Sequence, residues 1–318
     1  MRRSLNQVLA VVAMLCALGT AIAEPLRNGF DLAGALVPVE EILQGGPPKD
    51  GIPAIDRPAF VGARDATDLR PGDMVLGVFR NGIAKAYPIR ILNWHEVVND
   101  RFGAEGVVIT FCPLCGSGVA FESRAGNRAL RFGVSGLLYN SDVLLYDRET
   151  QSLWSQIKAL AVAGPLKGGS LTAVPVLHTT WADWRARYGD SLVLSQKTGY
   201  SRDYDGNPYA GYEKSPDLMF PVRFRAEGFH PKERVLGIAL EGKAKAYPFV
   251  ELAKGTNEVA DVVAGRAVRI RFSREHQSAE AFDAKGRPLV ATTLFWFAWA
   301  AFHPETELYR APRAKNGK

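Results

Sequence analysis

Cys112 and Cys115 are the residues whose type and spacing most directly predict chemistry. They lie in the segment CPLCG, residues 112–116. Two thiols separated by two residues can close a disulfide or bind one soft metal ion together. An apolar run of strand length precedes the pair, and Gly116-Ser117-Gly118, a poor helix former, follows it. This context favours a metal-binding turn over a redox pair at a helix start, and a structural disulfide is the third alternative.

A metal ion held by two thiolates needs further ligands, and histidine is the available type. The chain has five histidines. His95 falls on the apolar face of a helix expected over residues 88–102, and His276 aligns with Cys115 in an internal repeat. The predicted redox or metal site is therefore Cys112, Cys115, His95 and His276. Thiolate and imidazole ligands suit copper or zinc, and without a Walker or GxGxxG pattern no nucleotide cofactor is expected.

Two aromatic segments predict a second kind of site, which would bind a ligand. The tyrosine-rich loop TGYSRDYDGNPYAGYE, residues 198–213, offers Tyr204, Asp205 and Tyr209. The run LFWFAWAAFHP, residues 294–304, offers Trp296, Trp299 and His303. If the cysteines form only a structural disulfide, these residues would make the protein a binding module for a small molecule or a periplasmic protein.

An internal repeat suggests how the chain is organised. VLGVFRNGIAKAYP at residues 75–88 returns at residues 235–248 as VLGIALEGKAKAYP. Asn81-Gly82 predicts a tight hairpin turn between two strands, and a helix and two more strands should follow. The expected fold is a strand-rich α+β protein with two β-β-α-β-β units, residues 71–154 and 232–309. Residues 155–231 would be an insertion with a short helix near 180–188, residues 24–70 a lead-in, and residues 310–318 a tail.

The first 23 residues have the pattern of a secretory signal peptide. Arg2 and Arg3 precede an apolar stretch, and Ala21-Ile22-Ala23 matches a cleavage site. The mature chain would then be periplasmic or secreted, without a membrane span. Removal of the signal also removes Cys16, which leaves Cys112 and Cys115 as an even pair in an oxidising compartment.

Charge and composition exclude several classes of protein. The formal net charge of +6 comes from 39 basic and 33 acidic residues dispersed along the chain. A nucleic-acid-binding protein would concentrate its basic residues in a patch or stripe, so nucleic acid is not an expected partner. The hydrophobic fraction of 47% is that of a folded protein rather than a disordered one.

Several motifs together resemble one known family. They are AYPIRILNWHEVVND, TFCPLCGSG, FGVSGLLYNSDVLLYDRETQSLWSQ, TGYSRDYDGNPYAGY and FWFAWAAFHPETELY. The chain resembles the bacterial domain-of-unknown-function 3179 family over nearly all of its mature length. This resemblance supports the prominence of CPLCGSG and implies no particular reaction. If the protein is an enzyme, we expect an oxidoreductase or metal-transfer activity centred on Cys112 and Cys115.

Overall fold

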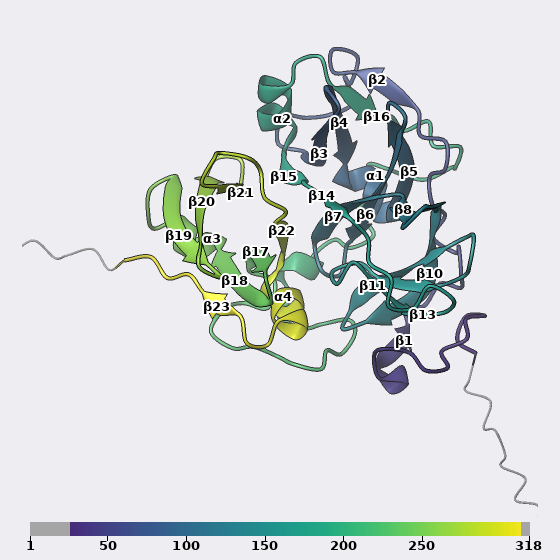
Figure 1. Cartoon of the computed structure of the whole chain (residues 1–318). Helices are drawn as coiled ribbons and strands as arrows, with labels where there is room; N and C mark the ends of the chain where they lie inside the picture. Colours follow the sequence, from purple (N-terminus) through teal and green to yellow (C-terminus); the bar gives the residue numbers. More distant parts are fainter. Residues whose placement is uncertain (1–25, 313–318) are drawn as a thin grey trace, which may run out of the picture.

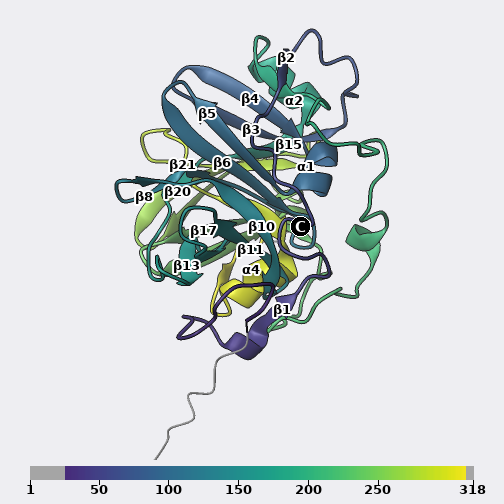
Figure 2. The same cartoon turned by 90° about the vertical axis from the view of Figure 1, so that its right-hand side faces the viewer.

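The computed structural model describes residues 26–312, so the predicted signal peptide lies outside the described residues. This part of the chain is rich in strands, which form five sheets and one two-stranded ribbon. The five sheets are arranged as the blades of a five-bladed β-propeller (Figures 1 and 2). Within residues 26–312, no helix is long and apolar enough to cross a membrane.

We number the sheets I to V. Sheet I has the strand order β1 (Ile42–Gln44), β10 (Phe132–Tyr139), β11 (Asp142–Asp147), β12 (Leu153–Ser155) and β13 (Leu160–Ala163). Sheet II contains β14 (Ala173–Val174), β7 (Ser117–Glu122), β6 (Glu105–Cys112) and β5 (Val97–Phe102). Sheet III contains β15 (Leu177–Thr180), β3 (Met74–Arg80), β4 (Ile83–Pro88), β16 (Leu192–Leu194) and β2 (Phe60–Gly62).

The last two sheets come from the C-terminal part of the chain. Sheet IV contains β22 (Thr292–Phe295), β17 (Arg234–Leu240), β18 (Lys243–Pro248) and β23 (Glu307–Leu308). Sheet V contains β19 (Glu258–Val263), β20 (Arg266–Ser273) and β21 (Ser278–Asp283). The ribbon pairs β8 (Arg124–Ala125) with β9 (Arg128–Ala129). Neighbouring strands are antiparallel except in the pairs β4–β16 and β18–β23.

The helices are short connections between strands. The described residues contain α1 (Ile89–His95), α2 (Trp181–Arg187), α3 (Phe249–Leu252) and α4 (Trp296–Phe302), and the 3-10 helices η1 (Val39–Glu41) and η2 (Tyr212–Lys214). The predicted helix near residue 180 is confirmed as α2. Thr180 caps α2 by accepting a hydrogen bond from the amide of Asp183 at 3.3 Å.

The expected α+β fold with two β-β-α-β-β units is wrong. The first expected unit is divided between three blades, because β3 and β4 belong to sheet III, β5, β6 and β7 to sheet II, and β10 and β11 to sheet I. The second is divided between sheets IV and V. The repeated sequence forms a local β-hairpin in both places, β3–β4 and β17–β18. Asn81 and Gly82 turn the first one with φ angles of 52° and 74°, as predicted.

The helix expected over residues 88–102 is also wrong beyond His95. Glu96 has a left-handed backbone with φ of 56°, which ends α1. Residues Val97–Phe102 then form β5, which pairs with β6 along its whole length. The β-branched Val97 and Val98 favour a strand here, and both are fully buried between sheets.

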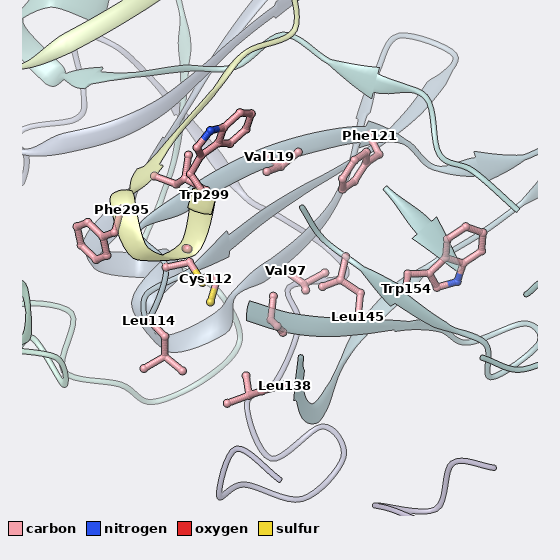
Figure 3. Close-up of a cluster of buried hydrophobic side chains, with 14 of the residues drawn as sticks. Val97, Cys112, Leu114, Val119, Phe121, Leu138, Leu145, Trp154, Phe295 and Trp299 are labelled. Carbon is pink, nitrogen blue, oxygen red and sulfur yellow. The ribbon is translucent and has the colours of Figure 1, made fainter. Parts of the chain in front are cut away.

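The largest hydrophobic cluster joins sheets I, II and IV. It includes Leu145 and Trp154 of sheet I, Phe121 of sheet II, and Phe295 with the start of α4 (Figure 3). Cys112 and Cys115 are part of this cluster, 1% and 0% exposed. The fold therefore places the CPLCG turn where three blades meet.

Candidate metal centre

The CPLCG turn connects β6 to β7 in sheet II. Cys112 is the last residue of β6 and pairs with Ser117 across the turn. Gly116 has a φ of 62°, and a Cβ at this position would lie 2.9 Å from the ring of Phe295. The amide of Phe295 donates a hydrogen bond to the carbonyl of Cys115 at 2.8 Å. The turn is thus fixed by its own sheet and by the end of β22 in sheet IV.

A third potential ligand comes from a different blade. Asp142 is the first residue of β11 in sheet I, after the turn residues Asn140 and Ser141, whose φ angles are 51° and 64°. The two Sγ atoms and a carboxylate oxygen of Asp142 all lie within 4.8 Å of one another, and all three residues are buried. Both thiols also face the carbonyl of Ser141, at 3.8 Å from Cys112 Sγ and 3.2 Å from Cys115 Sγ.

The electrostatics of this site are those of buried acidic groups without a nearby base. Desolvation raises the pKa of the Cys112 thiol, and it raises that of Cys115 further. Desolvation raises the pKa of Asp142 to about 7, and that of Glu96 to about 8, where the charge of Asp142 adds to the effect. Burying such groups as anions is costly unless a cation compensates their charge.

The carboxylate of Asp142 is only partly satisfied. One of its oxygens, Oδ2, accepts a hydrogen bond from the amide of Ile157 at 3.2 Å. The other, Oδ1, is buried and has no partner among the described residues. Buried acceptors are normally paired. An unpaired carboxylate oxygen beside two thiols could therefore be a ligand of a metal ion.

The two predicted histidine ligands lie outside this donor cluster. The ring of His95 is fully buried, with Nδ1 2.8 Å from the carbonyl of Pro53 and Nε2 2.7 Å from the hydroxyl of Tyr204. His276 lies in the turn between β20 and β21, with Nδ1 2.9 Å from Thr180 Oγ1. The structure therefore brings together two of the four predicted residues, and adds Asp142 to them.

A cleft of about 370 Å³ adjoins the CPLCG turn. Pro113 and Gly116 of the turn line it on one side, and Tyr204, Asp205 and Tyr209 of the tyrosine-rich loop line it on another. Asp205 accepts a hydrogen bond from Arg90 at 2.8 Å. Three of the residues predicted to bind a ligand thus lie in one wall of a cleft beside the thiols.

The other three residues predicted to bind a ligand belong to α4 and its end. Trp296 and Trp299 are each 3% exposed and pack in the core. His303 ends α4 and stacks on Trp299, with ring centroids 4.0 Å apart. The aromatic run therefore forms a short strand followed by a buried helix.

The histidine at the end of α4 predicts a pH dependence of stability. Burial, and then the charge of Lys158, lowers the pKa of His303 to about 4. An unfolded histidine with a pKa near 6.5 binds a proton that the folded one rejects, so stability is lost as the pH falls through this interval. The free energy of unfolding, measured by urea titration, should fall by up to about 1.4 kcal/mol per pH unit between pH 6.5 and 4 because of this group. We expect His303→Gln to remove this part of the pH dependence. Parallel pH profiles of the wild type and the variant would contradict this assignment.

Sequence reasoning missed Asp142, Glu96 and Tyr212 as parts of the site. The polar tripeptide Asn140-Ser141-Asp142 between two apolar runs is a turn signal, but it does not show which sheet the turn faces. Glu96 follows His95 directly, within residues 88–102, which we expected to form a single helix.

The described part of the chain is thus a five-bladed β-propeller. A buried cluster of two thiols and one carboxylate lies between its blades. The chain belongs to the family described as "Protein of unknown function (DUF3179)", whose model matches residues 49–306. This confirms the family resemblance. No curated protein and no solved structure matches the chain.

Proposed function

We propose that this protein binds a thiophilic metal ion at Cys112, Cys115 and Asp142, and that zinc is the ion its donors favour. One observation carries the proposal. Three side-chain atoms of metal-binding type, from two different blades, lie within 4.8 Å of one another, and all three side chains are buried. A divalent cation would compensate the negative charge of this site and pair the free oxygen of Asp142.

The donor set distinguishes between zinc and copper. Copper(I) prefers soft sulfur ligands, and a carboxylate adds little to its affinity. Zinc accepts thiolates and a carboxylate in the same tetrahedral shell. Copper(I) held by the two thiolates is the second outcome that the same measurement would identify.

A thiol–disulfide function is the second candidate, because the two sulfur atoms are close. A reactive thiol is normally accessible and has a lowered pKa. Here both thiols are buried, and burial raises the pKa of each. A purely structural disulfide would close a loop of four residues, which contributes only about 2 kcal/mol by chain entropy.

Metal analysis of the purified chain tests the proposal. Protein prepared without chelator should carry about one zinc ion per chain, since one cluster offers one coordination shell. Cys112→Ser and Asp142→Asn should each weaken zinc affinity at least about tenfold, because loss of even an outer-shell partner costs that much. Asp205→Asn changes a carboxylate in the cleft wall outside the cluster, and should retain the metal.

The oxidation state of the thiols separates the alternatives. Zinc-bound protein should present both Cys112 and Cys115 as free thiols on denaturation. Metal-free protein with a disulfide that resists reduction below about −300 mV would show a structural bridge. Metal-free protein with a disulfide reducible by cellular thiols would show a redox pair. Both of the metal-free results would contradict the proposed metal site.

A further inference from the structure

The donor cluster supplies three protein ligands, whereas zinc normally takes four. Structural zinc sites are closed by four protein ligands, and sites with three keep one position for an exogenous molecule. In sheet I, Ser141 and Asp142 cover one side of the thiols, and Phe295 of sheet IV packs against the turn. The remaining neighbour is the tyrosine-rich loop, which forms the wall of the 370 Å³ cleft.

Tyr212 lies in the wall of this cleft, beside the CPLCG turn. It begins η2, is 5% exposed, and lines the cleft together with Pro113 and Gly116. The ammonium of Lys232 lies 3.9 Å from the centroid of its ring and helps to fix it. Burial raises the pKa of Tyr212, and the nearby thiols of Cys115 and Cys112 raise it further. Tyr212 also belongs to the same hydrophobic cluster as Cys112 and Cys115.

The hydroxyl of Tyr212 is buried, and among residues 26–312 the backbone of Met219 approaches it without completing a well-formed hydrogen bond. Buried hydroxyl groups are normally paired, and an unpaired one destabilises the fold. Its position in the cleft wall beside the thiols indicates that the missing partner is a molecule bound at the cluster.

We propose that the fourth coordination position of the metal opens into the cleft and takes a small neutral nitrogen or oxygen donor that is hydrogen-bonded to Tyr212. This inference rests on the proposed metal site. In the binding step, a lone pair of the donor forms a bond to the metal, and no covalent bond of the donor breaks. A phenol hydroxyl can both donate and accept, so it can pair with the N–H of a coordinated imidazole or with a coordinated water.

The charge of the surroundings selects a neutral donor over an anion. Two thiolates and one carboxylate bring three negative charges to a cation of charge two. The cleft also contains more carboxylates than arginines, namely Asp68, Asp73, Asp205 and Glu213 against Arg70 and Arg90. Arg90 is itself paired with Asp68 and Asp205. An anionic ligand would add to this excess of negative charge.

Cobalt(II) in place of zinc provides the spectroscopic test, because its bands report on the coordination shell. The full chain is loaded with cobalt and titrated with imidazole, and separately with azide as the anionic probe. We expect imidazole to shift the absorption bands saturably at constant cobalt content, with azide at least about tenfold weaker. Tyr212→Phe should bind the same amount of cobalt and weaken imidazole binding at least about fivefold, the loss of one hydrogen bond.

Tyr188→Phe is the matched control, since this ring stacks on Phe79 and lines a different pocket. It should bind imidazole as the wild type does. Cobalt bands unchanged by imidazole would show a closed shell and overturn the inference while leaving the metal site intact. Imidazole binding unaffected by Tyr212→Phe, or azide binding tighter than imidazole, would also overturn it. Protein that takes up no metal would instead contradict the proposed function itself.

Discussion

Replacing Gly237 with alanine is expected to lower the free energy of unfolding by about 3 kcal/mol, the upper end of the usual cost of overpacking. A Cβ at this position would collide with the ring of Trp299. Trp299 is 3% exposed and packs in the largest core, so the ring has no room to move. The backbone of Gly237 is fixed as well, because β17 pairs with Ala246 on one side and Thr292 on the other. Urea unfolding at equilibrium measures the change.

Gly72→Ala is the control for this prediction. A Cβ on Gly72 would meet no atom within 4 Å, and we expect a change within about 0.5 kcal/mol. Removing the Trp299 ring should also show whether it causes the cost of Gly237→Ala. In a Trp299→Ala background, Gly237→Ala should cost much less than it does alone, as expected for residues in contact. Equal costs in the two backgrounds would show that the ring does not cover the strand.

A buried ion pair predicts the second large effect, for Asp100→Asn. Both carboxylate oxygens of Asp100 accept hydrogen bonds from Lys85 Nζ, at 2.9 and 3.0 Å, and Tyr87 donates another at 2.5 Å. The side chains of Lys85 and Asp100 are 8% and 6% exposed. The variant would leave a buried ammonium without its counter-charge, which costs about 3–5 kcal/mol. The free energy of unfolding from urea titration gives the measurement.

A more exposed copy of this arrangement provides the matched control. Asp261 accepts hydrogen bonds from Lys245 at 3.1 Å and from Tyr247 at 3.0 Å. The side chains of this pair are 14% and 20% exposed, against 8% and 6% for Lys85 and Asp100. Water can hydrate the remaining ammonium, and the carboxylate of Glu307 lies 3.6 Å from it, so we expect Asp261→Asn to cost about 1 kcal/mol. Equal costs for the two variants would contradict the role given to burial.

Local features were predictable from the sequence because they depend on neighbouring residues. Asn81-Gly82 specifies a hairpin through its tolerance of positive φ, and the spacing of Cys112 and Cys115 places two thiols at one turn. The short helix after Thr180 follows from its capping residue. The family could be predicted from motifs spread over the chain, and the match to residues 49–306 confirms it.

The blades were not predictable, because their strands come from distant parts of the chain. Sheet III, for example, pairs β3 with β15 and β4 with β16, about a hundred residues further on. A local pattern of two strands, a helix and two strands therefore suggested a unit that the long-range pairing divides. The same limit hid Asp142, which meets the thiols only because sheet I lies against sheet II. His276 was placed near the thiols by the repeat alignment and His95 by the helix expected over residues 88–102, whereas their hydrogen bonds go to Thr180 and Tyr204.

The hydrogen bond from Phe295 to the CPLCG turn also sets an order of events during synthesis. Residues 112–142, which carry all three donor atoms, leave the ribosome long before residue 295 does. Until then the turn lacks the strand end that fixes the carbonyl of Cys115 and the ring that covers Gly116. Contacts between such distant residues form late in folding. The finished arrangement of the two thiols and the carboxylate therefore belongs to the nearly complete chain, and a nascent or C-terminally truncated chain presents two loosely held thiols instead.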